Sequence, residues 1–187
     1  MRRFPCIILF MDIVNTFIAE TERLGLRGFT SEDEAALLQI WGNAEVMCLC
    51  GGGIDAELIR GMISVNLHNY REHGFAVFAV VRKADGVLVG AAGCKPDPED
   101  SRCGELIYHF RSDTWGQGFA SEAVAAYLAW LDGTRRLDRV AASALPGNAA
   151  SLRILQKNGF IQKGFVQFED TGYVPEPYFE RIVPQEG

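Results

Sequence analysis

Residues 104–131 read GELIYHFRSDTWGQGFASEAVAAYLAWL, and the rest of the chain is organised around this stretch. Its first seven residues are a short run of apolar and aromatic side chains, which is typical of a β-strand. Its second half repeats apolar residues at helical spacing, namely Ala123, Val124, Tyr127, Leu128 and Leu131. The stretch therefore predicts a strand, a loop and an amphipathic helix in direct succession.

The loop between the strand and the helix contains two glycines in the run GQGFAS, residues 116–121. Glycine lets the backbone turn sharply and approach a ligand closely. Because the run leads into a helix, the free N–H groups of the first turn and the positive end of the helix dipole favour an anion there. The expected anion is a phosphate or a pyrophosphate, and a plain tight turn is the alternative. The sequence contains neither the Walker nor the Rossmann phosphate motif.

Two blocks of sequence resemble a known family. The run WGQGFASEA, residues 115–123, is similar to motif A of the GNAT superfamily of acetyl-CoA-dependent N-acetyltransferases. This residue pattern resembles that of the Rim-type branch, the ribosomal-protein N-terminal acetyltransferases. Trp115 stands where the wider superfamily has Arg or Gln. The run NAASLRILQKNGF, residues 148–160, resembles that branch's Asn-x-x-Ser-x-Arg-x-Leu-x-Lys-x-Gly-Phe motif, and TERLGLR, residues 21–27, resembles its first strand.

This resemblance implies an α+β fold. We expect a mixed, mostly antiparallel sheet of six to seven strands, flanked by about four helices and opened by a V-shaped cofactor cleft. Residues 20–187 would be one acetyltransferase domain and residues 1–19 an N-terminal extension. The apolar run near the N-terminus invites interpretation as a signal peptide, but Asp12 and Asn15 interrupt it, and it is far shorter than the roughly 20 residues that span a membrane. We interpret it as an added strand or helix, an interface element or an upstream start.

The order of apolar runs, caps and turns predicts the remaining elements. A capping box in residues 30–34 and a capping Asp55 each begin a helix, and Ile59, Met62, Ile63 and Tyr70 are expected on one face of the second. The segment 42–54 between them is expected to be a loop on the acceptor side of the cleft. The other expected strands span residues 21–29, 75–81, 87–93, 139–145, 160–168 and 178–183, with a hairpin at Asp85-Gly86.

Composition narrows the class of protein. The chain has 187 residues, of which 48% are apolar and 22% charged, as expected for a single globular domain. A net charge of −6 argues against a nucleic-acid-binding protein. Five cysteines without a Cys-x-x-Cys pair and three scattered histidines do not match zinc-ligand spacing. We expect free thiols, a cytoplasmic location, no metal and no membrane partner, with Cys48 and Cys50 as a redox pair the alternative. Both a monomer and a homodimer are compatible with these observations.

The resemblance also implies which residues hold the acetyl-CoA cofactor. Main-chain N–H groups at the start of the helix would bind its pyrophosphate, and the main chain at the end of the central strand would pair with its pantetheine arm. Phe119 has the alternative role of a plain core residue. The implied cofactor-binding residues are Tyr108, His109, Phe110, Trp115, Gly116, Gln117, Gly118, Phe119, Ala120, Ser121, Asn148 and Ser151.

Two side chains are candidates for catalysis. In the family, the serine at the position of Ser151 can donate a proton to the leaving thiolate, and Glu105 could accept the amine proton through a water. Many GNAT enzymes use a tyrosine acid where this chain has Leu155, so Ser151 is the candidate that is left. The alternatives are helix capping for Asn148, a hydroxyl bonded to the cap for Ser151, and a structural ion pair for Glu105.

The chemistry favours one acceptor. A peptide α-amine, with a pKa near 8, is roughly a quarter neutral at cytosolic pH, whereas a lysine amine is only about 0.1% neutral. An enzyme without a strong base is therefore better matched to a protein or peptide N-terminus. The alternatives are acetylation of a small amine (an antibiotic, a polyamine or an amino acid) and an acyl-CoA-binding module without catalysis.

Overall fold

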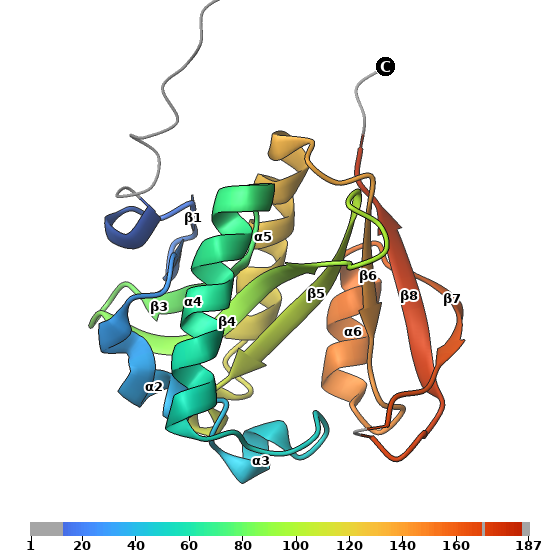
Figure 1. The fold of residues 1–187 in the computed structure, drawn as a ribbon, viewed down its shortest axis with the longest axis horizontal. Coiled ribbons are helices and arrows are strands. Elements are labelled where there is room, and N and C mark those ends of the chain that lie inside the picture. Colours follow the sequence, from blue (N-terminus) through green and yellow to red (C-terminus); the bar gives the residue numbers. More distant parts are fainter. Residues whose placement is uncertain (1–12, 170, 185–187) are drawn as a thin grey trace, which may run out of the picture.

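A computed structural model describes residues 13–169 and 171–184 of the chain. In this part, eight strands form one sheet in the order β1-β2-β3-β4-β5-β6-β8-β7 (Figure 1). All neighbouring strands are antiparallel except β5 and β6, which are parallel. The strands are β1 (Ala19–Glu20), β2 (Leu24–Arg27), β3 (Val77–Arg82), β4 (Val87–Pro96), β5 (Cys103–Phe110), β6 (Arg139–Ser143), β7 (Ile161–Val166) and β8 (Glu176–Ile182).

The mostly antiparallel α+β fold is thus confirmed, with one strand more than the expected six to seven. The difference is the two-residue strand β1, which pairs with β2 just upstream of the expected first strand. Ile13 is buried, and its carbonyl accepts a hydrogen bond from the main-chain N–H of Gly28 at 2.7 Å. The described part of the expected extension therefore packs against β2. Residues 1–12, including Cys6, lie outside the described residues, and the domain boundary at residue 19 stays a prediction.

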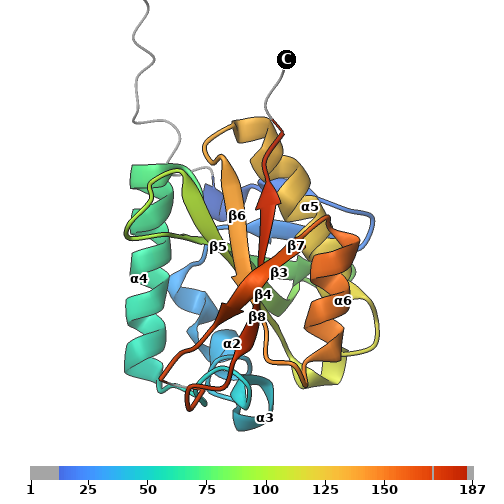
Figure 2. The same ribbon diagram turned by 90° about the vertical axis from the view of Figure 1, so that its right-hand side faces the viewer.

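The helices cover both faces of the sheet (Figure 2). On one face, α5 contributes the buried side chains of Val124, Tyr127 and Leu131 to the larger apolar core. On the other face, Trp41 and Ile59 belong to a second core beneath α2 and α4. The helical elements are η1 (Ser31–Asp33), α2 (Glu34–Leu38), α3 (Ala44–Met47), α4 (Ala56–His73), η2 (Ser112–Thr114), α5 (Phe119–Thr134) and α6 (Ala149–Lys157).

The first helices differ from the sequence-based expectation in detail. The Oδ1 atom of Asp55 accepts the main-chain N–H of Leu58 at 2.9 Å, so Asp55 caps α4 as predicted. The four predicted positions, Ile59, Met62, Ile63 and Tyr70, lie on one side of α4 by helical spacing. Only Ile59 and Ile63 of these are buried, and Met62 is 37% exposed. The buried positions are Ile59, Ile63 and Asn66, whose spacing of four and three follows the helical repeat and places Met62 beside the stripe.

The segment 42–54, expected to be a loop, contains the short helix α3. The side chain of Asn43 caps α3 by accepting the N–H of Glu45 at 2.9 Å. Elsewhere the predicted elements are confirmed with shifted ends, including the hairpin at Gly86, where φ is 74°. Across the described ranges, no helix is both long and apolar enough to cross a membrane.

The sheet opens between β5 and β6. These strands pair over only three residues each, from Cys103 beside Arg139 to Glu105 beside Ala141. Beyond Glu105, β5 continues to Phe110 along β4 but does not pair with β6. Among the described residues, one edge of the outer half of β5 therefore has no neighbouring strand. This split positions the candidate site.

Candidate active site

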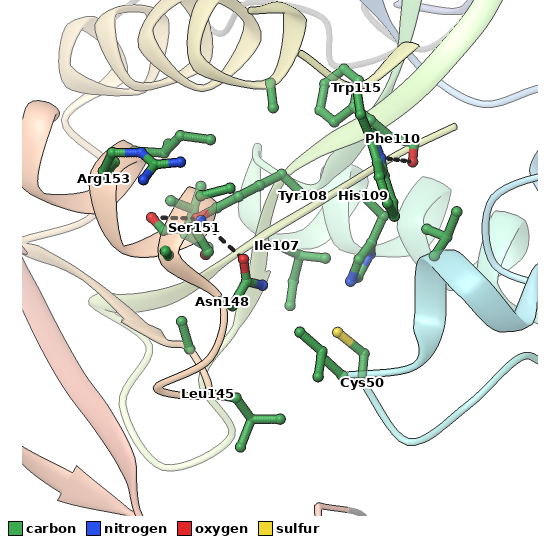
Figure 3. Close-up of a pocket in the computed structure, with 18 of the residues that line it drawn as sticks. Cys50, Ile107, Tyr108, His109, Phe110, Trp115, Leu145, Asn148, Ser151 and Arg153 are labelled. Carbon is green, nitrogen blue, oxygen red and sulfur yellow. Dashed lines mark hydrogen bonds between the residues drawn. The ribbon is translucent and has the colours of Figure 1, made fainter. Parts of the chain in front are cut away.

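A cleft of about 1060 Å³ lies where β5 and β6 separate. Its walls come from the outer half of β5, the starts of α5 and α6, the end of β6 and the region of α3 (Figure 3). The cleft brings together most of the residues that the sequence singled out. These are Glu105, Tyr108, His109, Phe110, Trp115, Gly116, Gly118, Phe119, Ala120, Ser121, Asn148 and Ser151.

The start of α5 forms the first wall. Gly116 and Gly118 have φ angles of 75° and 81°, in the left-handed region that side chains disfavour, which is why glycine stands at both positions. Gly118 is the N-cap, and no side chain caps the helix. Within the described residues, no group accepts the main-chain N–H groups of Ala120 and Ser121, two residues that line the cleft. This helix start is therefore available to an anion.

Arg23, the residue before β2, holds the glycine loop in place. Arg23 is ion-paired with Glu122 in the first turn of α5, and its Nη1 donates to the carbonyl of Gln117 at 3.1 Å. The same guanidinium stands 4.7 Å above the ring of Phe119. Phe119 is 5% exposed and belongs to the core, so its interpretation as a core residue is confirmed, although it also lines the cleft. No local sequence pattern indicates this contact, because Arg23 and Glu122 are 99 residues apart.

Two further residues of this loop, Gln117 and Trp115, donate side-chain hydrogen bonds to main-chain carbonyls. The side chain of Gln117 donates to the carbonyl of Asp113 at 3.2 Å, so any contact of Gln117 with the cofactor rests on its main chain. The indole of Trp115 is half exposed, and its Nε1 donates to the carbonyl of Phe110 at 3.0 Å. This bond ties the loop to the end of β5 at the mouth of the cleft (Figure 3).

The second wall carries a pair of hydroxyl groups. Asn148 caps α6 as predicted, since its Oδ1 accepts the N–H of Ser151 at 3.0 Å. The Oγ of Ser151 lies 2.5 Å from the hydroxyl oxygen of Tyr108, which reaches across from β5 (Figure 3). Burial raises the pKa of Tyr108 to about 12, so its phenol stays protonated at neutral pH. Leu155, where many GNAT enzymes have a tyrosine, is fully buried.

This contact of the Tyr108 side chain was not predicted from the sequence, which indicated a role only for the main chain of that residue. The two hydroxyl groups come from residues 43 positions apart, and no local pattern connects them. One signal was available, because the chain has Leu155 where many GNAT enzymes have a tyrosine on α6, but it has Tyr108 on β5. The fold brings the hydroxyl of Tyr108 to Ser151.

His109 points to the side of the sheet that α2–α4 cover. The Nε1 of Trp41 donates to its Nδ1 at 3.3 Å, which makes Nδ1 an acceptor and places the imidazole proton on Nε2. Burial lowers the pKa of His109 to about 4. His109 is therefore neutral at physiological pH and carries no charge into the cleft.

The carboxylates of the cleft differ in their partners. Glu105 forms an ion pair with Lys95 at 2.9 Å, so the alternative of a structural ion pair is present, and its role as a base stays a prediction. Glu176, at the start of β8, was not singled out by the sequence. It is only 5% exposed, and its Oε2 accepts a hydrogen bond from the hydroxyl of Ser143 at 3.0 Å.

Comparison with known proteins agrees with this geometry. Residues 23–161 match the acetyltransferase (GNAT) domain family, which is well over half of the chain. The chain belongs to the GNAT acetyltransferase family. This GNAT protein is 28% identical over 149 residues to an uncharacterized N-acetyltransferase, p20, of Bacillus licheniformis, covering 79% of this chain and 84% of p20.

Solved structures share the fold of this GNAT protein. An acetyltransferase (GNAT family) from Bacillus anthracis superposes with a TM-score of 0.77 at 24% identity, over 88% of this chain and 97% of that one. A ribosomal-protein-S5-alanine acetyltransferase from Vibrio fischeri gives a TM-score of 0.74 at 18% identity, over 88% and 95%. At these identities the likeness shows the fold alone.

The GNAT family generally uses acetyl-CoA as its acyl donor. The residues of the cleft fit such a donor, because within the described ranges they offer main-chain N–H groups without an acceptor at the start of α5 and a free edge of β5. The four described cysteines, Cys48, Cys50, Cys94 and Cys103, form no disulfide with one another. Among the described residues, no group of three or more His, Cys, Asp or Glu side chains is arranged to hold a metal ion.

Proposed function

We propose that this GNAT protein transfers the acetyl group of acetyl-CoA to the α-amine of a protein or peptide N-terminus. One observation carries the proposal. The uncapped start of α5, the open edge of β5 and the hydroxyl of Ser151 all line the same cleft. An anion site, a track for an extended thioester arm and a proton donor thus lie along one path.

The start of α5 is the proposed pyrophosphate site. The main-chain N–H groups of Gln117, Gly118, Ala120 and Ser121 would donate to its oxygens, helped by the helix dipole. The pantetheine arm would lie along residues 108–110 as an added half-strand, where one main-chain amide polarises the thioester carbonyl. Asn148 would contribute its amide nitrogen, because its Oδ1 is already engaged with the N–H of Ser151.

The proton balance of the reaction uses the hydroxyl pair. The amine nitrogen forms a bond to the carbonyl carbon, and the carbon–sulfur bond breaks. The thiolate takes the proton of the Ser151 hydroxyl, and the phenol of Tyr108 returns a proton to Ser151 through their 2.5 Å contact. Tyr108 then regains its proton from solvent. The acceptor nitrogen loses its own proton to solvent through a water beside Glu105.

An N-terminal α-amine is the acceptor that this site suits. It is neutral often enough near pH 7 to react without a strong base, unlike a lysine side chain. Neutral His109 and ion-paired Glu105 are weak candidates for a strong base. The Vibrio fischeri neighbour is a ribosomal-protein-S5-alanine acetyltransferase, which supports a protein as the acceptor.

The test is acetyl transfer by the purified protein. The panel contains peptides with free N-termini, the same peptides N-acetylated but carrying a lysine, and small amines such as spermidine and an aminoglycoside. We expect mass spectrometry to find one acetyl group, on the free N-terminus. Transfer to the small amines alone would contradict the proposed acceptor. Binding of coenzyme A without transfer to any amine would instead indicate an acyl-CoA-binding module.

A further inference from the structure

One face of β5, β6 and β8 carries polar side chains into the cleft. Val140 and Ala142 belong to the core on the α5 side, so Ser143 faces the opposite side of β6. Ser143 lies beside Tyr178 in the register of β6 and β8, and Glu176 precedes Tyr178 by two residues, so it shares that face. The hydrogen bond from Ser143 to Glu176 agrees with this placement. The result is a buried carboxylate on the wall opposite the start of α5.

The carboxylate of Glu176 is only half satisfied. Its Oε2 accepts the Ser143 hydroxyl, whereas its Oε1 is buried and has no hydrogen-bond partner among the described residues. A buried carboxylate oxygen without a donor is costly, because water no longer solvates it. Native proteins rarely leave such a group unpaired without a functional reason. The site therefore lacks one hydrogen-bond donor.

Three basic side chains line the cleft, namely Lys95, Arg153 and Lys157. Lys95 pairs with Glu105 at 2.9 Å. Within residues 13–169 and 171–184, no ion pair involves Glu176. A ligand that brings its own positively charged N–H group would supply both the missing donor and the missing charge.

We infer that Glu176 binds the acceptor first in its ammonium form, before the amine loses its proton to solvent and attacks, with Ser143 as the residue that positions the carboxylate. The inference rests on the proposed function and deepens it, because it names what the acceptor must carry. A primary ammonium offers up to three N–H donors. A hydroxyl or thiol acceptor would leave the carboxylate without a counter-charge. The substrate class is therefore a cationic primary amine, here the α-ammonium of a peptide.

Binding measurements test this inference without relying on turnover. The probes are a hexapeptide with a free α-amine and the same hexapeptide N-acetylated, titrated by calorimetry into the complex of the protein with coenzyme A. We expect the wild type to bind the free-amine peptide about tenfold more tightly than its acetylated twin, as for one charge-assisted hydrogen bond. Glu176→Gln should abolish this preference and leave the affinity for coenzyme A unchanged.

Two further variants serve as controls. Glu45→Gln removes the same charge from an exposed position that also lines the cleft, and it should keep the tenfold preference. Ser143→Ala keeps the charge but frees the carboxylate, so it should reduce the preference to about threefold. Thermal melting checks that each variant is folded, and Ser143→Ala carries the test if Glu176→Gln does not fold.

The outcomes separate this inference from the proposed function. Equal binding of the two peptides by the wild type, or a preference that survives Glu176→Gln, would overturn the role of Glu176. If the preference is present and depends on Glu176 but no peptide is acetylated, the ammonium site stands and the transferase proposal fails. If peptides are acetylated and Glu176→Gln leaves the preference intact, only the inference about Glu176 fails.

Discussion

The two walls of the cleft are built in different ways. The wall at the start of α5 offers main-chain N–H groups, and two glycines with positive φ present them within six consecutive residues, 116–121. The opposite wall offers side chains whose partners are distant in sequence. Ser143 meets Glu176 across 33 residues, and Tyr108 meets Ser151 across 43. A contiguous main-chain site leaves a motif in the sequence, whereas a site assembled across a sheet does not.

The largest effect should come from the proton donor of the second wall. Ser151→Ala removes the only hydroxyl in contact with that of Tyr108 among the described residues, and we expect kcat to fall about 100-fold. The affinity for coenzyme A should change little, because the cap made by Asn148 uses the main chain of Ser151. Assays of acetyl transfer measure kcat, and calorimetry measures the affinity for coenzyme A. An unchanged kcat would remove Ser151 from the mechanism.

The next largest effect tests the first wall. Gly118→Val forces a β-branched residue into a φ of 81° and adds a side chain at the proposed pyrophosphate site. We expect the dissociation constant of coenzyme A to rise about 50-fold, equivalent to the loss of one charge-assisted hydrogen bond together with backbone strain. Gly133→Ala, further along α5 where an added Cβ meets open space, is the matched control and should bind normally. Normal affinity of the Gly118 variant would place the anion elsewhere.

A pH experiment tests whether burial keeps His109 neutral. Its pKa is about 4 in the folded protein, below its ordinary value of 6.5, so the unfolded chain takes up a proton first as the pH falls. His109 should therefore cost the protein about 2 kcal/mol of stability between pH 7 and pH 5. His109→Gln keeps an acceptor for Trp41 but cannot titrate.

Urea unfolding at both pH values measures this difference. The free energy of unfolding of the wild type should fall more steeply than that of His109→Gln over this interval. Parallel losses in the two proteins would show that His109 is not held neutral by burial. Because His109 stays neutral above pH 6, the variant should have the same pH profile of kcat as the wild type from pH 6 to pH 8.

The smallest effect concerns the partner of Ser151. Tyr108→Phe keeps the ring and removes the hydroxyl, so Ser151 loses one hydrogen bond and its source of a replacement proton. We expect kcat to fall about fivefold, with the KM for acetyl-CoA unchanged. Tyr178→Phe, which removes a hydroxyl bonded to Glu180 on β8, is the matched control and should keep its kcat. A loss in Tyr108→Phe as large as that in Ser151→Ala would make the phenol itself the essential donor.

Local signals were sufficient for much of the fold. The Asp85-Gly86 hairpin, the caps at Asp55 and Asn148 and the glycines before α5 act within a few residues, so their sequence pattern predicted them correctly. The error arose in the segment 42–54, where α3 is a single turn that a polar cap creates inside an expected loop. Packing also decides how deeply each residue of a helix face is buried, so Met62 is exposed beside Ile59 and Ile63.

By itself, the sequence determined the family, the strand–loop–helix and the main-chain wall of the cleft, because those features depend on backbone conformation within one short segment. Only the tertiary structure decided which side chains face that wall. The early end of the β5–β6 pairing at Glu105 opens the cleft, and the register of β6 with β8 brings Glu176 to it. These contacts depend on strand register and on the alternation of side chains across a sheet, which join residues that no local pattern connects.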